Sequence, residues 1–378
     1  MKKIVISADS FKGTLTSCEV CKILGNAARN EFCDSEVVLV PIADGGEGTL
    51  DVFESIEGFE SVEGYFTDLN GEKTLSKYLY NKTDRLAVIE TAQTAGLPNS
   101  KSKDPTKTTT LGMGEQIKYA VENGAEKVII TLGGSGTNDG GAGMLHALGA
   151  KFIDEGGKEF IPVGGTLKNI ARVDLTELER YKKVGFTAMC DVENPPFGEN
   201  GATYVYGRQK GATEDQLPLL DDGIKNLTEL LSKARGEELS TLKGGGAAGG
   251  LGLAIYGALG GELKKGIEVA MELAGLEKQL EDADVLITGE GKLDEQSFMG
   301  KVVDGVSRLA KAHSVPVVVI AGAVDVFDKE VLEKNGIVAA FPTVNKAIPF
   351  EEIKPRSKDN LKRTAESVFS LMHAFSRS

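Results

Sequence analysis

The chain has 378 residues, of which 41% are hydrophobic and 26% charged, so we expect a soluble globular protein with two domains. Its 56 acidic residues outnumber the 43 basic ones, giving a net charge of −13, which argues against nucleic acid or an anionic membrane as partner. The sequence starts directly with an apolar run and contains no run long enough to span a membrane, so we expect a cytoplasmic protein.

The first sixty residues alternate short apolar runs with helical patterns. The runs at 3–8 and 36–42 are rich in Val and Ile, as is typical of buried strands. Apolar residues at helical spacing predict helices at 16–31 and 47–56. The order strand, helix, strand, helix indicates a βαβ beginning, and therefore a parallel sheet.

The pattern changes at about residue 60. Residues 60–90 alternate apolar and polar side chains around an Asn-Gly turn at 70–71, which predicts a hairpin or meander. Strands and helices are mixed from there to about 210, and helices dominate from about 214.

Parallel-type strands return near the C-terminus, at 284–288, 315–320 and 337–341, and an amphipathic helix follows at 358–375. We therefore predict an α/β fold with a Rossmann-like, doubly wound parallel-sheet domain that is discontinuous in sequence. Its two parts are residues 1–60 and 265–378, and a mixed-sheet α/β domain is inserted at 61–264. The cleft between two such domains is where we expect the active site.

Several apolar runs end in a loop that combines glycine with acidic residues. These loops are ADSFKG at 8–13, ADGGEG at 43–48, GGSGTNDGG at 133–141 and GEGKLDEQS at 289–297. Ligands of open parallel sheets bind just outside the carboxyl ends of the strands. Glycine there lets backbone N–H groups approach an anion, and carboxylates there hold Mg2+ or take a proton. A site with both kinds of group indicates metal-dependent phosphoryl transfer.

The first two loops carry a lysine and several carboxylates. Lys12, beside Asp9, can pair with a phosphate or a carboxylate as a point charge. Asp44 and Glu47 flank paired glycines at a helix start, where phosphate could bind, although Asp44 can equally serve as a simple helix cap.

The loop at 133–141 is expected to form an anion-binding nest. It has five glycines, more than a tight turn needs, together with Ser135, Thr137, Asn138 and Asp139. Another candidate loop, at 190–202, places Asp191 and Asn194 after a predicted strand, where they could hold a metal or a substrate hydroxyl.

The last loop supplies candidate metal ligands. Glu290 and Asp294 could bind Mg2+, and Lys292 or Lys301 could meet phosphate. The chain has three histidines, none at metal-binding spacing, so we expect any general base to be a carboxylate. No Walker A sequence is present, which argues against a P-loop mechanism.

A set of motifs in fixed order covers nearly the whole chain. They are ADSFKGT at 8–14, PIADGGEGT at 41–49, GGSGTNDGGAGML at 133–145, CDVENPPFGENGA at 190–202, QKGA at 209–212, GGGAAGGLG at 244–252 and ITGEGKLDEQSFMGK at 287–301. Together they resemble the type 1 glycerate kinase family of bacteria, with Pro196-Phe197 standing where the family usually has a leucine.

The resemblance implies a kinase with ATP as phosphoryl donor, Mg2+ as cofactor and D-glycerate as acceptor, and 2-phosphoglycerate as product. It implies an active region lined by Ser10, Lys12, Asp44, Gly45, Gly46, Asp139, Asp191, Glu290 and Asp294. In this interpretation Lys12 binds the substrate carboxylate, and Asp191, or secondly Asp44, is the base. Glu290 and Asp294 hold Mg2+. Contacts to phosphate or substrate are expected from Gly133, Gly134, Ser135, Gly136, Thr137, Asn194, Gly244, Gly245 and Lys292.

Other functions remain open at this point. The sequence by itself does not separate 2-phosphorylation from 3-phosphorylation of glycerate. A non-catalytic protein that binds an organic acid, or a phosphatase or mutase that uses the same metal, would also need such loops. The many carboxylates argue against a simple anion binder, because they would repel an anion in the absence of a metal.

Overall fold

The computed structural model describes residues 1–46, 48–326, 328–345 and 349–376, so Glu47 lies outside the described residues. The chain forms two compact units. The terminal unit consists of Met1–Asp44 and Ile267–Ser378, and the central unit of Gly45–Gly266.

The terminal unit contains a five-stranded parallel sheet, as predicted for a doubly wound domain. Its strands, in spatial order, are β16 (Ile337–Pro342), β14 (Val317–Ala321), β12 (Val285–Thr288), β1 (Lys3–Ile6) and β2 (Glu36–Leu39). β12 and β14 are buried throughout, because a parallel sheet covered on both faces needs continuous apolar strands.

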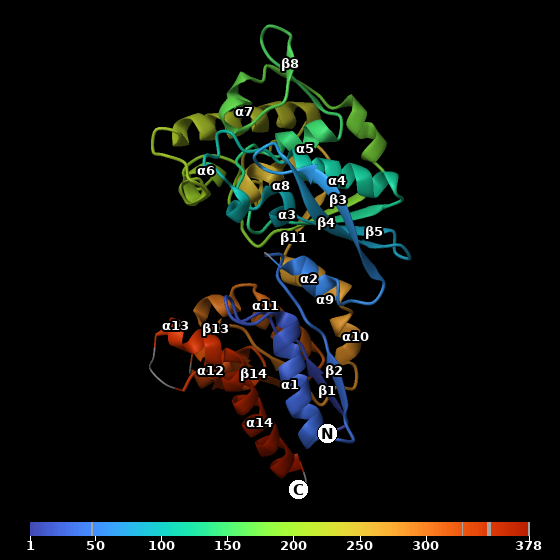
Figure 1. Ribbon diagram of the computed structural model, residues 1–378, viewed down its shortest axis with the longest axis vertical. Helices are drawn as coiled ribbons and strands as arrows, with labels where there is room; N and C mark the ends of the chain where they lie inside the picture. The colour runs from blue at the N-terminus through green and yellow to red at the C-terminus, as the bar shows by residue number, and fades with distance from the viewer. Residues whose placement is uncertain (47, 327, 346–348, 377–378) are drawn as a thin grey trace. The chain divides into compact units, whose positions relative to one another are not determined.

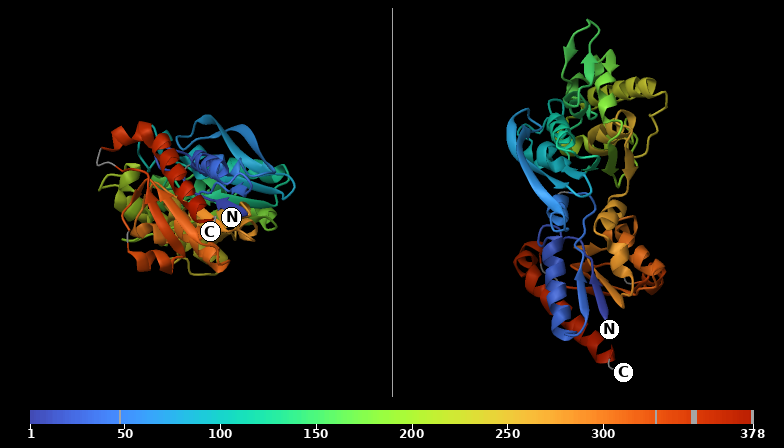
Figure 2. Two further views of the ribbon diagram at one scale, coloured as in Figure 1. Left: turned by 90° about the horizontal axis from the view of Figure 1, so that it is seen from below. Right: turned by 90° about the vertical axis from the view of Figure 1, so that its right-hand side faces the viewer.

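Helices cover both faces of this sheet. On one face α1 (Ser17–Glu31) and α14 (Ser357–Ser376) pack against each other and share a core with Ile4 and Ile6 of β1 (Figure 1). α11 (Val302–Ala312) contacts β12 and β14 and takes no part in that core, which places it on the opposite face. Figure 2 shows helices on the two sides of the strands.

The start of α1 follows from a capping box. The Thr16 hydroxyl accepts a hydrogen bond from the Glu19 N–H, and the Glu19 carboxylate accepts one from the Thr16 N–H. The remaining short elements of the terminal unit are α9 (Gly266–Leu273), α10 (Leu276–Leu280), α12 (Lys329–Lys334), α13 (Phe350–Ile353), β13 (Lys292–Leu293) and β15 (Ala323–Val324).

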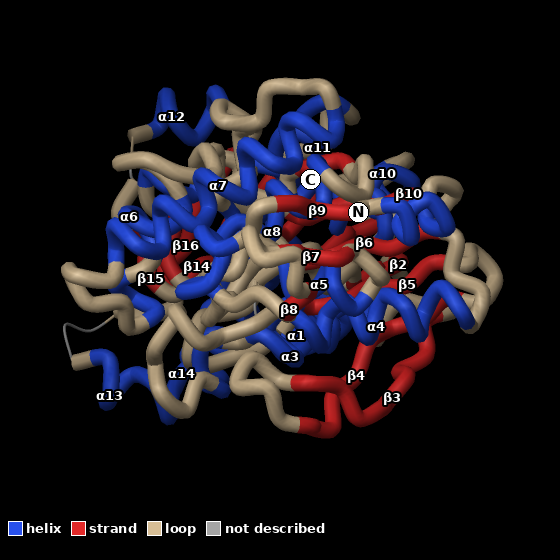
Figure 3. Tube along the Cα trace, turned by 90° about the horizontal axis from the view of Figure 1, so that it is seen from above, coloured by secondary structure: helices blue, strands red, loops and turns tan. Residues whose placement is uncertain are grey.

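The central unit is built on a mixed six-stranded sheet. Its strands, in spatial order, are β11 (Glu262–Lys264), β10 (Gly185–Met189), β6 (Lys127–Thr131), β5 (Leu86–Glu90), β4 (Lys73–Asn81) and β3 (Phe59–Thr67). The first four are parallel, while β3 and β4 form the predicted hairpin and pair antiparallel at the margin of the sheet (Figure 3).

Several helices of the central unit share one apolar core with this sheet, namely α3 (Thr91–Ala95), α4 (Leu111–Glu122), α5 (Ala142–Ala147), α7 (Leu217–Arg235) and α8 (Ala247–Gly257). The unit also contains the short helices α2 (Thr49–Phe53) and α6 (Ala202–Tyr206). A small antiparallel sheet adds β7 (Lys151–Ile153), β8 (Glu159–Phe160) and β9 (Arg172–Asp174). No helix among the described residues is both long enough and apolar enough to cross a bilayer.

Candidate functional site

In the terminal unit, three carboxylates follow three neighbouring strands. Asp9 comes after β1, Asp44 after β2 and Glu290 after β12. Because β12, β1 and β2 are adjacent and parallel, the loops that leave their carboxyl ends share one edge of the sheet. The Asp9 N–H donates to the Gly289 carbonyl at 2.8 Å, which ties two of these loops together.

The three carboxylates interact electrostatically. Burial, together with the negative charges of Asp44 and Glu290, raises the pKa of Asp9 to about 7. The Ser10 N–H, which donates to Asp9 Oδ1 at 2.6 Å, acts in the opposite direction but does not cancel the effect. For Asp9, burial and the neighbouring negative charges therefore outweigh the stabilisation that its hydrogen bonds provide.

Glu290 is the most buried member of this group, with 8% of its surface exposed. Burial raises its pKa, and the charges of Asp294 and Asp44 act in the same direction, against the ammonium of Lys301. Within the described part of the chain, Glu290 Oε1 has no hydrogen-bond partner. A buried, unpaired carboxylate oxygen among like charges is a position that fits a cation.

The other predicted residues of the terminal unit lie on the surface of these loops. Asp294 is partly committed, because its Oδ1 accepts from the Gln296 N–H at 3.0 Å and caps a 3-10 helix at Glu295–Phe298. The Lys292 ammonium lies 2.7 Å from Asp325 Oδ2 and 3.6 Å from Asp294 Oδ2. Lys12 is exposed on the loop after β1.

A metal site made of protein ligands alone is not present among the described residues, where no group of three or more His, Cys, Asp or Glu could hold an ion. Mg2+ needs no such cage, because it commonly binds through one or two carboxylates together with substrate phosphates and water. The pair Glu290 and Asp294 is compatible with that mode of binding.

In the central unit, three more strand ends share an edge. β10, β6 and β5 are adjacent and parallel, so Asp191, the loop at 133–139 and Glu90 lie at the same edge of that sheet. The Asp191 Oδ1 atom accepts a hydrogen bond from the Gly266 N–H at 2.8 Å, and Asp191 remains exposed.

Much of the predicted nest at 133–137 is hydrogen-bonded within the protein. The N–H groups of Gly133 and Gly136 donate to the carbonyls of Gly45 and Ala95, at 3.2 and 2.8 Å. The Thr137 N–H donates to Ser135 Oγ at 3.2 Å. These donors shape the loop, and its glycines permit close packing: a Cβ on Gly133 would lie 2.7 Å from the Gly46 Cα.

Asp139 is fully buried and holds the beginning of α5. Its carboxylate accepts from the N–H groups of Thr110, Gly141 and Gly143, at 2.7, 3.1 and 3.2 Å. Burial raises its pKa, and these hydrogen bonds oppose that effect. Nearby, the buried Lys210 of the QKGA motif donates from Nζ to the Thr137 carbonyl at 2.7 Å, which was not predicted.

The glycines at 244–245 pack against the loop that contains Asn194. A Cβ on Gly244 would lie 2.8 Å from Cys190 Sγ, and one on Gly245 would lie 2.8 Å from Pro196 Cγ. The Asn194 Oδ1 atom accepts from the Tyr206 hydroxyl at 2.7 Å. Close packing of two loops therefore accounts for these glycines without a ligand.

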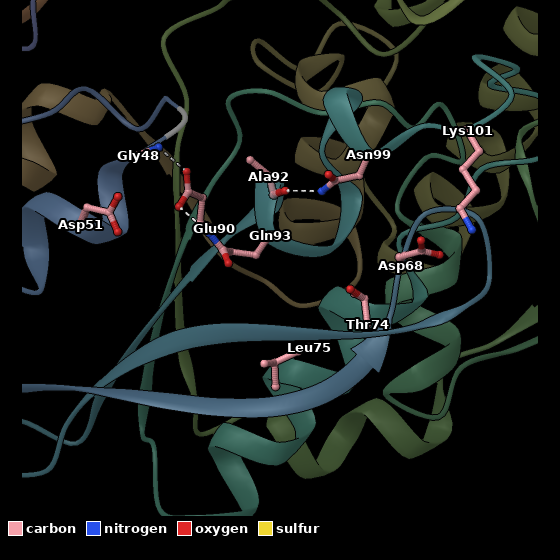
Figure 4. Close-up of a pocket in the computed structure, with 10 residues that line it drawn as sticks. All are labelled: Gly48, Asp51, Asp68, Thr74, Leu75, Glu90, Ala92, Gln93, Asn99 and Lys101. Atoms are coloured by element: carbon pink, nitrogen blue, oxygen red, sulfur yellow. Dashed lines mark hydrogen bonds between the residues drawn. The ribbon is translucent and has the colours of Figure 1, made fainter. Parts of the chain in front are cut away.

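The sequence prediction did not include Glu90 or the pocket beside it. This pocket of about 610 Å3 lies within the central unit, and Figure 4 shows Glu90 between Gly48 and Gln93. Glu90 also ends an apolar run, LAVIE, but the segment that follows is TAQTAG, with no glycine until Gly96. A search for any acidic residue at the end of a buried strand, whether or not glycine follows, would have identified Glu90.

Several known proteins that are similar to this chain are described as glycerate kinases. The model of the glycerate kinase family matches residues 4–373. A glycerate kinase of Bacillus cereus is 39% identical, and a glycerate 2-kinase of Escherichia coli is 38% identical, each over 97% of this chain and 97% of its own length. A crystal structure described as that of a candidate glycerate kinase 2 from Salmonella typhimurium LT2 has a TM-score of 0.89 and 36% identity, covering 100% of both chains.

The match extends over nearly the full length in sequence and over the full length in fold, and it confirms the predicted resemblance. The chain belongs to the glycerate kinase family.

Proposed function

We propose that this protein is an ATP-dependent glycerate 2-kinase. It transfers the γ-phosphoryl group of ATP to the 2-hydroxyl of D-glycerate and yields 2-phosphoglycerate and ADP, with Mg2+ as cofactor. The observation that supports this most directly is Glu290 Oε1, which is buried without a partner among the described residues at a strand end adjacent to that of Asp9, whose pKa burial and nearby negative charge raise. The name of the Escherichia coli relative supports the position of transfer.

Glu290 is the proposed principal ligand of Mg2+, since its Oε1 is buried without a partner among the described residues. Asp294 and Asp44 are the further carboxylates whose charges act on Glu290. When bound, the metal neutralises charge on the phosphoryl oxygens during transfer.

The substrate-binding roles fall to residues of both units, which we propose act on the same pair of substrates. The Lys12 ammonium pairs with the carboxylate of glycerate. The Asp191 carboxylate takes the proton of the 2-hydroxyl as the bond from that oxygen to the γ-phosphorus forms and the bond from the γ-phosphorus to ADP breaks. Asp44 is the second candidate for this base.

Phosphate contacts are assigned to the glycine loops and one lysine. The loops are 45–46, 133–137 and 244–245, and the lysine is Lys292. Since several N–H groups at 133–137 are committed to protein acceptors, the proposed contribution of these loops is their shape and their remaining polar atoms. Catalysis then consists of positioning and charge neutralisation.

A coupled ADP-release assay with D-glycerate, ATP and Mg2+ tests this function, and phosphorus NMR of the product identifies the position of transfer. We expect glycerate-dependent ADP release that stops when the metal is chelated, with 2-phosphoglycerate as product. 3-Phosphoglycerate would establish the alternative regiochemistry. Binding of glycerate without ADP release would identify an organic-acid binder, and release of inorganic phosphate from phosphoglycerate would identify a phosphatase.

A further inference from the structure

The pocket in the central unit has a predominantly polar lining with excess negative charge. Glu90, Asp68 and Asp51 contribute carboxylates, and Lys101 contributes an ammonium group (Figure 4). Lys101 forms an ion pair with Glu72, so its charge is already matched outside the pocket. These carboxylates would repel a phosphate or a carboxylate group. The part of a ligand that binds in this pocket is therefore not anionic.

Glu90 is the most buried of these carboxylates, and its hydrogen-bond partners are uncharged. It is 1% exposed, and it accepts from the Gly48 N–H at 2.7 Å and from the Gln93 amide at 3.4 Å. By contrast, Asp51 pairs with Lys77 at 3.1 Å, and Asp68 accepts the N–H groups of a turn. The Leu50 N–H also bonds to Glu90, and because a carboxylate has about four lone-pair sites, Glu90 can still accept a further hydrogen bond from a ligand.

Neutral hydrogen-bonding groups complete the lining. The amides of Gln93 and Asn99 and the hydroxyl of Thr74 face the pocket and can both donate and accept. The volume of about 610 Å3 is typical of a site for a ligand much larger than a three-carbon acid. These features match a neutral group that carries hydroxyls and ring nitrogens.

Segments that line the pocket are also connected to two of the glycine loops to which phosphate contacts are assigned. Gly48, which follows the loop at 45–46, donates to Glu90. The segment 91–99, which carries Gln93 and Asn99, is bonded to the loop at 133–137, since Leu97 N–H donates to the Gly134 carbonyl at 2.8 Å. A ligand that has a neutral part and a phosphate part could thus bind with its neutral part in the pocket and its phosphates toward these loops.

We propose that this pocket binds the nucleoside part of the phosphoryl donor, with Glu90 accepting hydrogen bonds from ribose hydroxyls and Gln93 bonding a polar atom of the nucleoside. This inference rests on the proposed ATP-dependent reaction. It assigns donor recognition to the central unit and to residues outside the glycine loops. Gln93 is a binding residue here, with no part in the transfer step.

Adenosine, which is the nucleoside without the phosphates, is the probe that tests the pocket. Isothermal titration calorimetry should show adenosine binding to the wild type, and Gln93→Leu should weaken it by about fivefold or more. Gln279→Leu in α10, outside the pocket, is the matched control and should leave adenosine binding unchanged. Binding of Mg2+-tripolyphosphate, which represents the phosphates without the nucleoside, should be unaffected by Gln93→Leu.

The possible outcomes test the assignment of the pocket separately from the proposed reaction. If Gln93→Leu and the wild type bind adenosine equally, or if neither binds it, the nucleoside assignment is wrong even when the enzyme releases ADP with glycerate. If Gln93→Leu weakens the binding of D-glycerate and not of adenosine, the pocket belongs to the acceptor. If adenosine binds as expected but no glycerate-dependent ADP release occurs, the pocket assignment stands and the proposed reaction fails. Glu90→Gln, which keeps the shape of the side chain, should also weaken adenosine binding.

Discussion

At the scale of single residues, the terminal unit keeps carboxylates where they oppose its own folding. Burial and neighbouring carboxylates raise the pKa of Asp9 and of Glu290. A group of this kind is expected where function, rather than stability, requires the charge. It can be tested through stability, independently of catalysis.

The pKa of Asp9 predicts how stability depends on pH. In the folded protein this pKa is about 7, against 3.8 for an ordinary Asp, so between these values the folded state binds more protons than the unfolded state. Stability therefore falls as pH rises through that window. In metal-free protein we expect Asp9→Asn to remove part of this loss, as measured by calorimetric melting temperature from about pH 4 to about pH 8.

Two further measurements make the Asp9 prediction specific. Asp34→Asn, on the exposed surface, should keep the pH dependence of the wild type. Added Mg2+ should raise the melting temperature of the wild type near pH 8 more than that of Asp9→Asn. Identical pH profiles for wild type and Asp9→Asn would show that Asp9 has an ordinary pKa.

Lys12 is the residue whose removal tests substrate binding. Lys12→Ala should lower kcat/KM for D-glycerate by about tenfold or more, which corresponds to about 1.4 kcal/mol of lost transition-state stabilisation. Lys22→Ala, an exposed lysine of α1, should leave kcat/KM unchanged. A Lys12→Ala enzyme with wild-type kinetics would exclude Lys12 from the site.

At the scale of elements, glycine has a packing role where it was predicted to bind anions. α8 contains three consecutive residues in the left-handed region: Ala248, Gly249 and Gly250, with φ of 53°, 71° and 92°. This kink brings the helix onto the loop at 133–141, where the Gly140 N–H donates to the Gly249 carbonyl at 3.0 Å. The motif GGGAAGGLG thus fits two segments of chain together.

Gly249→Ala should therefore be far more damaging than its backbone angle alone implies. A Cβ at Gly249 would lie 2.0 Å from the Thr137 carbonyl oxygen, so we expect a loss of about 3 kcal/mol or more in the free energy of unfolding. Gly236, at the end of α7, has a similar φ of 75° and open space around it, and Gly236→Ala should cost about 1 kcal/mol. Urea denaturation compares the two, and equal losses would mean that backbone strain, not the contact with Thr137, determines the effect.

The same elements show what the sequence can predict. The strands of the terminal unit were predictable because buried parallel strands are continuous apolar runs, and their neighbouring loops were predictable from the position of ligand sites in such sheets. The hydrogen bonds of the 133–137 loop were not, because their acceptors at Gly45 and Ala95 are distant in sequence. Glu90 was missed because its strand ends in a helix without the glycine that marked the other loops.

At the scale of the whole molecule, the proposed function divides its tasks between the units. The metal and the acceptor carboxylate are assigned to Glu290 and Lys12 of the terminal unit, and the nucleoside and the general base to residues of the central unit. Each unit has its own core and its own strand-end loops, so each could bind one part of the substrates independently. Ligands that represent different parts of the reaction should then act on different segments of the chain.

Hydrogen–deuterium exchange with peptide resolution tests this division. Adenosine should slow exchange at 91–99 in the central unit and leave the loops at 8–13 and 289–294 of the terminal unit unchanged. ATP, Mg2+ and D-glycerate together should slow exchange in all three segments, because binding of a ligand raises the free energy of local opening. Glu290→Gln should reduce the added protection at 289–294 while keeping the protection at 91–99. If the complete set of substrates protected one unit alone, the proposal that both units act on the same pair of substrates would be wrong.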